Sequence, residues 1–504
     1  MAGRVNHPCQ AGVQHMQPPG VGLPTRPSGS AVGIAATGHL GRRLTTTSEE
    51  GGRGGCFRRP EPAHRGTAGG ASHDQGRFCL AVALVLSKPA VAGAERGPEQ
   101  VIPGPYDVLI LDASVKQSLA GVRSLGQAGL RVAAGDSVAQ FDPAVALPAF
   151  RSRYCQRSVT LPDLVTDTSA FVSAVIEFVR ENSLRAVMPA GDITIGVLRP
   201  YRQQLAALGC FLALAPEQAL EIANDKDRTL AMARELGILY PRSVNITDFA
   251  DIDRAAAEFG YPFVLKPTIS WDGRSVERLV PVDVTSRGEA AEFMTRILGA
   301  GSGLLAQEWV PGRREGVSLF VADDEVIAAC GHIAHRTSPP LGGASVVRES
   351  IAPPADTLDV AVRLAKAIGL QGPCEVEFRR DAAGRALLME INARLAGTIE
   401  NAVQSGVDLP LMIWRWATGQ DNEPVMAHRT GVRTRWLHGD LRWLVQNWKR
   451  PGRPDSVPRL RSIGVFLAEF GKGVRYDYFD HRDVRPFIAE LRYTLHVLGK
   501  FGRS

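Results

Sequence analysis

The sequence predicts an α/β amino-terminal domain with a parallel sheet, followed by a larger α+β block, behind a disordered amino-terminal extension. Residues 106–137 read as strand, helix and strand with short links, which is typical of a βαβ unit. Residues 261–392 contain several strand-like apolar runs around one helical segment. The expected divisions are 1–104 (low complexity), 105–215 (α/β domain), 216–420 (α+β block of two subdomains) and 421–504 (helical, aromatic region).

The first hundred residues differ in composition from the rest of the chain. Residues 1–105 hold 11 Lys and Arg against 6 Asp and Glu, with 19 Gly and 11 Pro, whereas the remainder has 47 basic and 46 acidic residues. Such Gly and Pro content without a period is typical of disorder, so we expect a chain starting near residue 105 to fold. Whether residues 1–104 belong to the mature protein stays open. The excess positive charge lies mostly there, so it does not indicate nucleic-acid binding by the folded part.

Cysteine usage and hydropathy predict a cytoplasmic protein. The seven cysteines are scattered, with no CxxC pair and no Cys/His cluster, which argues against structural zinc and disulfides. No apolar run approaches 18 residues, so no transmembrane helix is expected.

The α/β domain has no obvious phosphate-binding turn. Its strands are expected at 106–114, 130–137 and 184–194, and ligands of such sheets bind beyond the carboxyl ends of the strands. The segments that follow two of these strands, LDASVKQ and PAGDIT, lack the GxGxxG pattern. This argues against a dinucleotide-binding oxidoreductase.

The α+β block is expected to begin with one helix at 217–238. A strand, a polar loop and a second strand follow within 261–282. The remaining elements are a helix at 356–370 and strand-like runs at 304–312, 316–334, 373–381 and 386–392.

The carboxyl-terminal region is rich in tryptophan, since five of the seven Trp residues lie between 414 and 448. A helix near 436–448 is expected to pack on the α+β block through one apolar face. The residues of that face are Leu437, Leu441, Leu444 and Val445, with Trp448 beside them. The alternative, a basic aromatic helix in weak peripheral contact with a membrane, stays open.

An acidic hairpin is the strongest chemical signal. In LLMEINARLAG (387–397), an acid, an amide and a guanidinium occur at every second position: Glu390, Asn392 and Arg394. Period two places them on one face of a strand. The preceding run PCEVEFRRD is a second strand, and a turn over 381–384 joins the two. With this turn, Glu375 is expected to lie opposite Glu390. Glu377 and Glu390 are then diagonal neighbours, with β-carbons roughly 6–8 Å apart.

Two carboxylates that close repel unless a cation lies between them. With the amide oxygen of Asn392 they form a donor set suited to Mg²⁺, which takes the rest of its shell from water and phosphates. The alternative is a solvated hairpin edge. Two upstream lysines favour a site: Lys226 opens a helical run, and Lys266 ends an apolar strand before a polar loop, where it can contact a phosphate.

These pieces together resemble the ATP-grasp superfamily, in particular carbamoyl phosphate synthetase and the single-chain carboxylate–amine ligases. The resemblance spans about residues 106–420 and is most specific in the VEF…MEINAR pair. The matching segments, in family order, are NDK (224–226), VLKP (264–267), AQEWVPG (306–312), GLQGPCEVEF (369–378) and LLMEINARLAG (387–397).

The resemblance implies a role for each matching position. It implies phosphate contacts from Lys226 and Lys266, with Lys266 also catalytic, and a catalytic Arg394 that faces the transferred phosphate. The other implied roles are adenine contacts at Glu308 and Val310, a ribose contact at Glu315, and Mg²⁺ (alternatively Mn²⁺) ligands at Glu377, Glu390 and Asn392. The loop 268–275 would cover the phosphates, and His335 or Arg336 would lie on the acceptor side.

The implied activity is that of an ATP- and Mg²⁺-dependent ligase, which activates a small carboxylate as an acyl phosphate for attack by an amine. A bicarbonate-using carboxylase or carbamoyl-phosphate type enzyme is the nearest alternative. An ATP-binding regulator without turnover is the other, and the presence of both hairpin carboxylates argues against it. The identity of the carboxylate and amine, and whether the protein is a homodimer, stay open.

Overall fold

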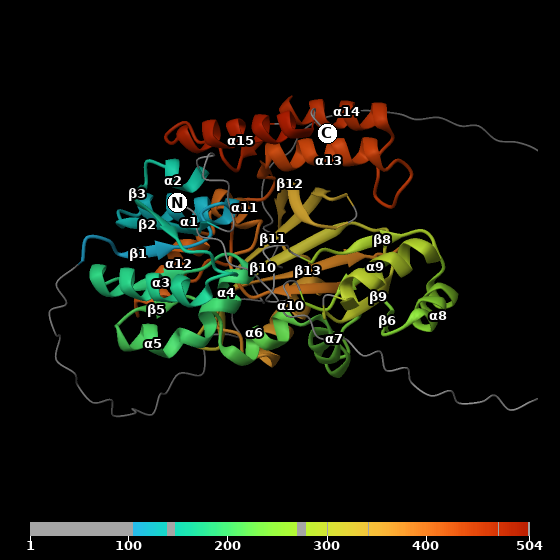
Figure 1. Ribbon diagram of the computed structural model, residues 1–504, viewed down its shortest axis with the longest axis horizontal. Helices are drawn as coiled ribbons and strands as arrows, with labels where there is room; N and C mark the ends of the chain where they lie inside the picture. The colour runs from blue at the N-terminus through green and yellow to red at the C-terminus, as the bar shows by residue number, and fades with distance from the viewer. Residues whose placement is uncertain are drawn as a thin grey trace, which may run out of the picture. The chain divides into compact units, whose positions relative to one another are not determined.

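The computed structural model describes residues 104–138, 147–269, 279–299, 301–340, 342–471 and 473–501. Residue contacts divide the chain into units 1–95 and 96–504, and every described residue belongs to the second. The prediction about residues 1–104 therefore falls outside the described part, apart from Gly104. The described residues form three sheets with helices around them (Figure 1).

A five-stranded parallel sheet confirms the predicted α/β amino-terminal domain. Its strand order is β3-β2-β1-β4-β5, so the order reverses beside the central strand β1. Alternate residues of β1 enter different cores: Val108 and Ile110 pack with α1, and Leu109 packs with α3. The strands are β1 (Val108–Ile110), β2 (Val132–Ser137), β3 (Cys155–Leu161), β4 (Ala186–Met188) and β5 (Phe211–Leu212). The helices are α1 (Lys116–Gln127), α2 (Pro148–Arg151), α3 (Thr168–Asn182), α4 (Asp192–Leu198), η2 (Arg199–Tyr201) and α5 (Arg202–Ala207).

The second sheet is small and antiparallel, in the order β6-β9-β7-β8. Two helices, α8 and α9, bury their apolar sides with it in a separate core. Its elements are β6 (Ser243–Ile246), α8 (Phe249–Phe259), β7 (Phe263–Pro267), β8 (Val282–Val284), α9 (Arg287–Gly299) and β9 (Leu304–Glu308).

The third sheet has seven strands, in the order β14-β13-β10-β11-β12-β15-β16. The expected hairpin forms its edge, where α6 and α7 contact β14. The strands are β10 (Arg314–Ala322), β11 (Glu325–Ser338), β12 (Ala344–Ile351), β13 (Gly372–Arg380), β14 (Ala386–Asn392), β15 (Arg433–Arg435) and β16 (Arg475–Tyr476). The associated helices are α6 (Glu217–Asn224), α7 (Lys226–Glu235), α10 (Ala355–Ala367), α11 (Ile399–Ser405) and α12 (Leu409–Ala417).

Two expected elements are each divided in the structure. The helix expected at 217–238 breaks at Asp225, whose backbone is extended and whose side chain accepts bonds from the first turn of α7. An aspartate in this position is a helix N-cap, so a new helix starts there. The strand-like run 316–334 is a hairpin that turns at Asp323 and Asp324, both with positive φ. Aspartate tolerates that conformation better than most residues.

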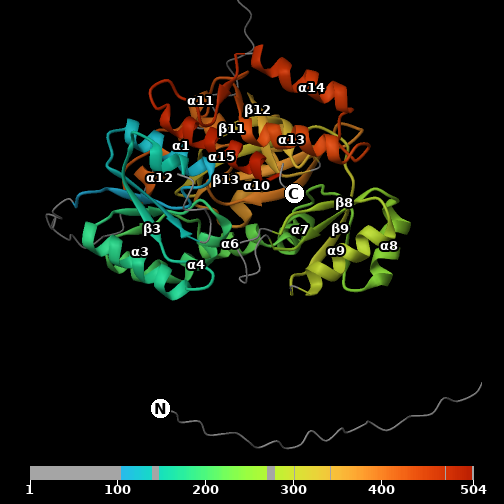
Figure 2. The same cartoon turned by 45° about the horizontal axis from the view of Figure 1, so that its top comes forward.

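The carboxyl-terminal helices are α13 (Leu437–Lys449), α14 (Arg459–Ala468), η3 (Glu469–Gly471) and α15 (Arg485–Phe501). Helix α13 packs on β11 and β12, and both α14 and α15 contact α13 (Figures 1 and 2). No helix within the described ranges combines the length and hydropathy needed to cross a bilayer.

The buried face of α13 is not the predicted one. Trp443 and Asp440 are buried, whereas Val445 and Trp448 are exposed. Asp440 accepts hydrogen bonds from Arg336 and Arg435, both buried. The side of the helix that faces the sheet therefore carries a carboxylate paired with two guanidinium groups. This pairing, and not the leucine pattern, determines which face of α13 is buried.

The loop between α13 and α14 connects the second and third sheets through ion pairs. Arg453 binds Glu289 of α9 at 2.5 Å and Asp283 of β8 at 3.2 Å. Two residues later, Asp455 binds Arg379 of β13 at 2.6 Å and Arg314 of β10 at 3.0 Å. We call this loop, residues 450–456, the clasp.

Candidate active site

The carboxyl end of the parallel sheet holds the start of α4 in place. Asp112, just after β1, accepts hydrogen bonds from the backbone N–H groups of Ala190 and Gly191 and from the hydroxyl of Thr194. Gly191 is required there, because a β-carbon would lie 2.8 Å from Oδ1 of Asp112. The loop after β4 thus fixes the first residue of α4, Asp192, at the switch point of the sheet.

Two lysines meet where α7 begins beside the end of β7. The backbone N–H of Lys226 donates to the carbonyl of Thr268, so the start of α7 lies against the end of the strand that carries Lys266. Nζ of Lys266 donates to Oε1 of Gln307 on β9 at 2.5 Å. Burial lowers the pKa of Lys266 to about 8, and nearby carboxylates, Glu390 first, oppose this shift.

The β13–β14 hairpin has the predicted strands and turn but another register. Glu377 lies directly opposite Glu390, and Glu375 lies opposite Asn392. Two shifts of one residue cause the difference: at the turn, Arg380 pairs with Ala386 instead of Arg385, and a bulge between Glu377 and Phe378 leaves Met389 as an extra residue before Glu390. The two carboxylates are therefore direct cross-strand neighbours instead of diagonal ones, which brings their β-carbons to about 4.5–5.5 Å.

The polar ends of this hairpin form one cluster. Nδ2 of Asn392 lies 3.0 Å from Oε1 of Glu377 and 3.3 Å from Oε1 of Glu390. Burial, with the opposing Glu390 second, raises the pKa of Glu377 well above its usual value. A cation bound between the two carboxylates would offset their mutual repulsion and favour the charged form of Glu377.

Arg394 ties the hairpin to the amino-terminal domain. Its guanidinium is ion-paired through Nε with Oδ1 of Asp192, and Nη2 lies 3.4 Å from Oδ2. Burial opposes the charged form, but Asp192 and nearby carboxylates keep the pKa of Arg394 above its usual value. The arginine is therefore a fixed cation, held from the opposite wall of the site.

These groups line one cavity of about 200 Å³. Five of the residues predicted from the sequence contribute to its lining: Lys226, Lys266, Glu390, Asn392 and Arg394. Glu377 reaches it through Asn392. The structure thus brings together both lysines, the acidic cluster and the arginine from segments spread over residues 226–394.

The donor set fits a hard divalent cation that also binds an anionic ligand. Within the described ranges, no group of three or more His, Cys, Asp and Glu forms a closed metal cage. Two carboxylates and one amide oxygen leave coordination positions for water and phosphate oxygens, as Mg²⁺ prefers. The three hairpin residues can therefore hold Mg²⁺ only together with such a ligand.

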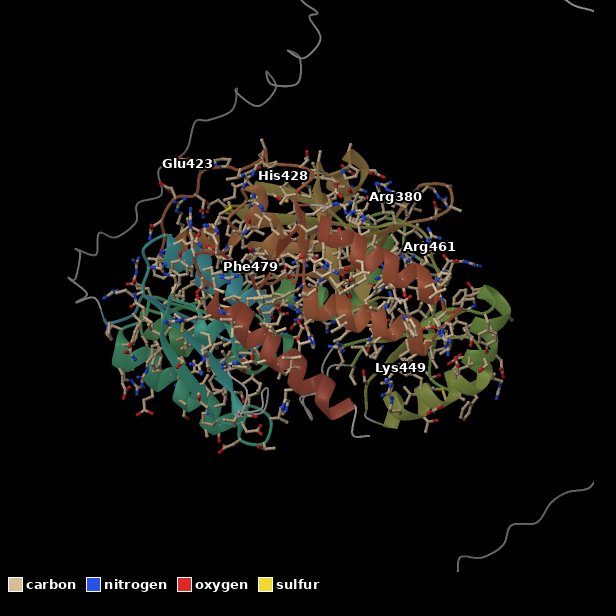
Figure 3. All side chains as sticks on the ribbon, turned by 90° about the horizontal axis from the view of Figure 1, so that it is seen from above. Arg380, Glu423, His428, Lys449, Arg461 and Phe479 are labelled. Atoms are coloured by element: carbon tan, nitrogen blue, oxygen red, sulfur yellow. The ribbon has the colours of Figure 1, made fainter. Side chains whose placement is uncertain are left out.

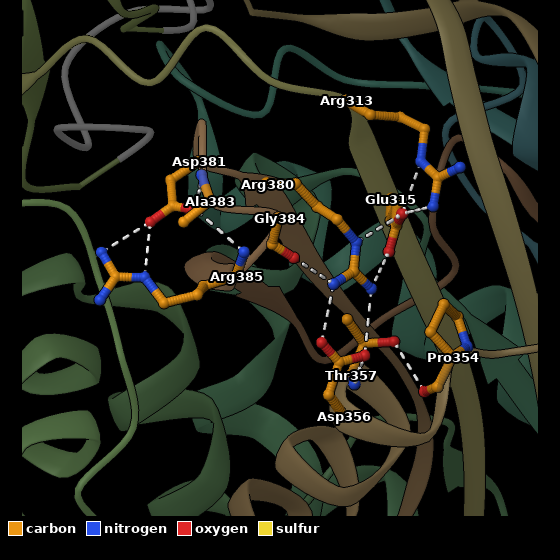
Figure 4. A network of polar contacts seen from close by, with 10 residues as sticks. All are labelled: Arg313, Glu315, Pro354, Asp356, Thr357, Arg380, Asp381, Ala383, Gly384 and Arg385. Atoms are coloured by element: carbon orange, nitrogen blue, oxygen red, sulfur yellow. Dashed lines mark hydrogen bonds and ion pairs between the residues drawn. The ribbon is translucent and has the colours of Figure 1, made fainter. Parts of the chain in front are cut away.

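Glu315 does not reach this cavity. It is buried, and its carboxylate is ion-paired with Arg313 and Arg380, while Arg380 also binds Asp356 (Figure 4). Glu308 lies at the end of β9 in an ion pair with Arg242 at 2.7 Å. Val310, two residues later, is buried.

The segment expected on the acceptor side points elsewhere. His335 binds Glu349 at 2.9 Å, and Arg336 is buried against Asp440 and Glu469. Both side chains belong to the contact between β11 and the carboxyl-terminal region. Of the loop 268–275, only Thr268 and Ile269 are described, and Ile269 lines the cavity.

The cavity wall contains polar residues that the sequence did not predict, among them Asp192 and Gln307. Gln307 precedes Glu308 in the segment AQEWVPG, so the period-two pattern of β9 could have placed it on the same face as Leu305. Asp192 has no local signal, because its partner lies 202 residues away.

Comparisons with known proteins agree with this geometry. The family model described as ATP-grasp in the biosynthetic pathway with Ter operon matches residues 304–439. A D-alanine–D-alanine ligase of Ectopseudomonas mendocina is 26% identical over 190 residues, which cover 34% of this chain and 56% of the relative. A carbamoyl phosphate synthase large chain of Thermomicrobium roseum is 26% identical over 204 residues, covering 39% of this chain and 18% of the relative.

Solved structures share the fold. The biotin carboxylase complex with β,γ-ATP from Campylobacter jejuni superposes with a TM-score of 0.51 at 16% identity, covering 65% of this chain and 74% of that one. The biotin carboxylase domain of 2-oxoglutarate carboxylase from Hydrogenobacter thermophilus, with MgADP and bicarbonate, gives 0.50 at 15% identity, covering 65% and 73%. The chain spans about half the length of the D-alanine–D-alanine ligases that it matches.

Proposed function

We propose that this ATP-grasp protein is an ATP- and Mg²⁺-dependent ligase, which converts a small carboxylate into an acyl phosphate that an amine then attacks. One observation carries the proposal: two lysines, a paired-carboxylate cluster and a fixed arginine line a single cavity. The sequence relatives support it, because D-alanine–D-alanine ligase and carbamoyl phosphate synthase are both named for bond-forming reactions.

The two lysines are proposed to bind the triphosphate. Lys266 is buried and held by Gln307, so its ammonium is already oriented toward the cavity when a nucleotide arrives. Lys226 at the first residue of α7 adds a second cation, and the backbone of Glu308 and Val310 is proposed to contact adenine. Glu315 is not assigned a ligand, because Arg313 and Arg380 hold its carboxylate.

The hairpin is proposed to hold the metal through Glu377, Glu390 and Asn392. Bound there with ATP, Mg²⁺ (or Mn²⁺) neutralises charge on the phosphates and favours displacement at the terminal phosphorus. In the apoprotein, Asn392 keeps the two carboxylates together by donating to both.

Arg394 is proposed to orient the groups that react. A substrate carboxylate oxygen attacks the terminal phosphorus, the bond to the β-phosphate oxygen breaks, and ADP leaves. The amine nitrogen then attacks the acyl carbon, loses a proton, and phosphate leaves. Both steps place negative charge near a guanidinium that Asp192 holds rigid, so positioning and charge stabilisation supply the catalysis.

The test is ADP release with Mg–ATP, measured against a panel of amino acids and small carboxylates with and without amines. Hydroxylamine in place of the amine traps an acyl phosphate as a hydroxamate. We expect ADP release that depends on the carboxylate, and a hydroxamate product.

Other functions give other results in the same assay. ADP release with bicarbonate alone would indicate a carboxylase or a carbamoyl-phosphate type enzyme. This alternative is retained because biotin carboxylases share the fold. ATP binding without ADP release under every condition would indicate a regulator and contradict the ligase proposal.

A further inference from the structure

The carboxyl-terminal helices carry most of the exposed apolar side chains of the described chain. Of 17 large apolar residues that are exposed there, 11 lie between residues 445 and 495. Single exposed apolar residues are normal on a soluble protein, but a concentration of them marks an interaction surface.

The exposed apolar residues follow helical spacing. Val484, which directly precedes α15, and Ile488, Leu491 and Leu495 within it are separated by four, three and four residues, so they form one stripe. On α14, Leu460 and Leu467 are seven residues apart and also share a face. Leu460 is 82% exposed and Leu495 is 60% exposed.

The helices that carry the two stripes lie on the same side of the protein. Helices α14 and α15 flank α13 and run along the upper edge in Figure 1, and all three helices face the viewer in Figure 3. The side chains of both stripes are exposed, so the stripes are not part of the protein core.

Charge on this side is of one sign. Arg459 and Arg461 of α14 and Arg485 and Arg492 of α15 are exposed, and Figure 3 labels Arg461 beside its helix. Among the described residues, Arg461, Arg485 and Arg492 have no acidic partner. The acidic residues of this region are buried, half-buried or, for Asp455, paired in the clasp: Asp440, Asp455, Glu469, Asp477, Asp480, Asp483 and Glu490.

We propose that this side, which we call the α14–α15 face, docks on an anionic lipid surface. The face comprises Leu460, Leu467, Ile488, Leu491 and Leu495 with Arg459, Arg461, Arg485 and Arg492. Leucines beside arginines suit the boundary between acyl chains and anionic headgroups, where apolar burial and electrostatic attraction both favour binding. A second copy of the chain fits less well, because it would place arginines against arginines. A nucleic acid or an acidic protein would neutralise the arginines but leave the leucines in water.

The test is co-sedimentation of the full-length protein with vesicles of phosphatidylcholine and phosphatidylglycerol, against vesicles of phosphatidylcholine alone. We expect binding only to the anionic vesicles, lost when NaCl rises from about 0.1 M to about 1 M because the charges are screened. The double variants Leu491→Ser/Leu495→Ser and Arg461→Gln/Arg492→Gln should each weaken binding about tenfold or more.

Two exposed residues elsewhere serve as matched controls: Met426→Ser for the leucines and Lys366→Gln for the arginines. Both controls should bind vesicles as the parent does, and a thermal melt confirms that every variant is folded. The proposal is overturned if the parent ignores anionic vesicles, or if the controls weaken binding as much as the face variants do. It is also overturned if the leucine variants abolish only self-association in sedimentation velocity, or if heparin binds parent and leucine variants alike while vesicles do not.

Discussion

The carboxylate of Asp192, at the first residue of α4, is ion-paired with the guanidinium of Arg394, two residues past the end of β14. The pair joins the amino-terminal parallel sheet to the acidic hairpin across the cavity. Arginine has rotational freedom along its side chain, and this contact removes it. In the proposed ligase, Asp192 is therefore a positioning residue that acts through Arg394.

Replacing Asp192 with Asn keeps the size and one acceptor but removes the charge that holds Arg394. We expect turnover to fall about 10²-fold, because a displacement of about 1 Å costs that much, with little change in the affinity for Mg–ATP. The control is Asp253→Asn, which removes an exposed ion pair with Arg287. Equal turnover in both variants would show that Asp192 has no positioning role.

Replacing Glu390 with Gln removes one negative ligand from the proposed metal site and keeps the shape of the side chain. Stability of the apoprotein should not fall, since a like-charge contact with Glu377 is relieved. Turnover should fall by orders of magnitude, because charge stabilisation by the metal is largest in the transition state. Metal-dependent ATP binding and ADP release measure this, with the exposed Glu235→Gln as control. If Glu390→Gln keeps full metal-dependent ATP binding and full ADP release, the hairpin is not the metal site.

Lys266→Met replaces a buried cation with an apolar side chain of similar length. We expect ATP to bind at least tenfold more weakly while ADP loses less affinity, because the lost contact is proposed for the outer phosphates. Thermal stability without ligand should stay or rise, since burial disfavours the charged lysine. Calorimetric titration with ATP and ADP measures the difference. Unchanged ATP affinity would contradict the assignment.

Glu490 gives a pH prediction that is independent of the active site. Burial raises its pKa to about 8 from the ordinary 4.5, with Asp477 as a second cause. Between these values the unfolded chain has lost the proton and the folded chain keeps it. The free energy of unfolding therefore falls as pH rises from about 4.5 to 8. Glu490→Gln removes this loss, so it should stabilise the protein on the order of 4 kcal/mol at pH 8 and not at pH 4. Denaturant unfolding at both pH values tests it, and an equal gain at both would contradict it.

Local patterns were sufficient for the strands of the hairpin. Period two and a Gly-containing turn predicted 373–381 and 386–392, and the structure has Gly372–Arg380 and Ala386–Asn392. The register was not predictable in this way, because the turn shifts every pair by one residue and the bulge shifts the pairs beyond it by one more. Such a bulge depends on how both strands pack in the sheet.

Long-range ion pairs explain the other differences. The leucine pattern of α13 predicted its buried face incorrectly, because Asp440 meets Arg336 and Arg435 from other strands. Glu315 matches an expected ligand position by sequence order, but its carboxylate is ion-paired with Arg380 of the neighbouring strand β13. Neither contact can be predicted from the spacing of nearby residues, because Arg336 and Arg380 lie far from their partners in the sequence. The site residues that sequence order and the structure both bring together are those of the hairpin and the two lysines.

The clasp has a kinetic consequence. A cavity of about 200 Å³ is smaller than the ~300–1,000 Å³ of typical ligand pockets, so we expect its walls to separate when a nucleotide binds. Two of those walls belong to the second and third sheets, which Arg453 and Asp455 hold together. Such a separation would break ionic contacts that are partly exposed to solvent, and salt screens such contacts. We therefore expect nucleotide exchange to become faster as ionic strength rises, through a loop that lines no part of the cavity.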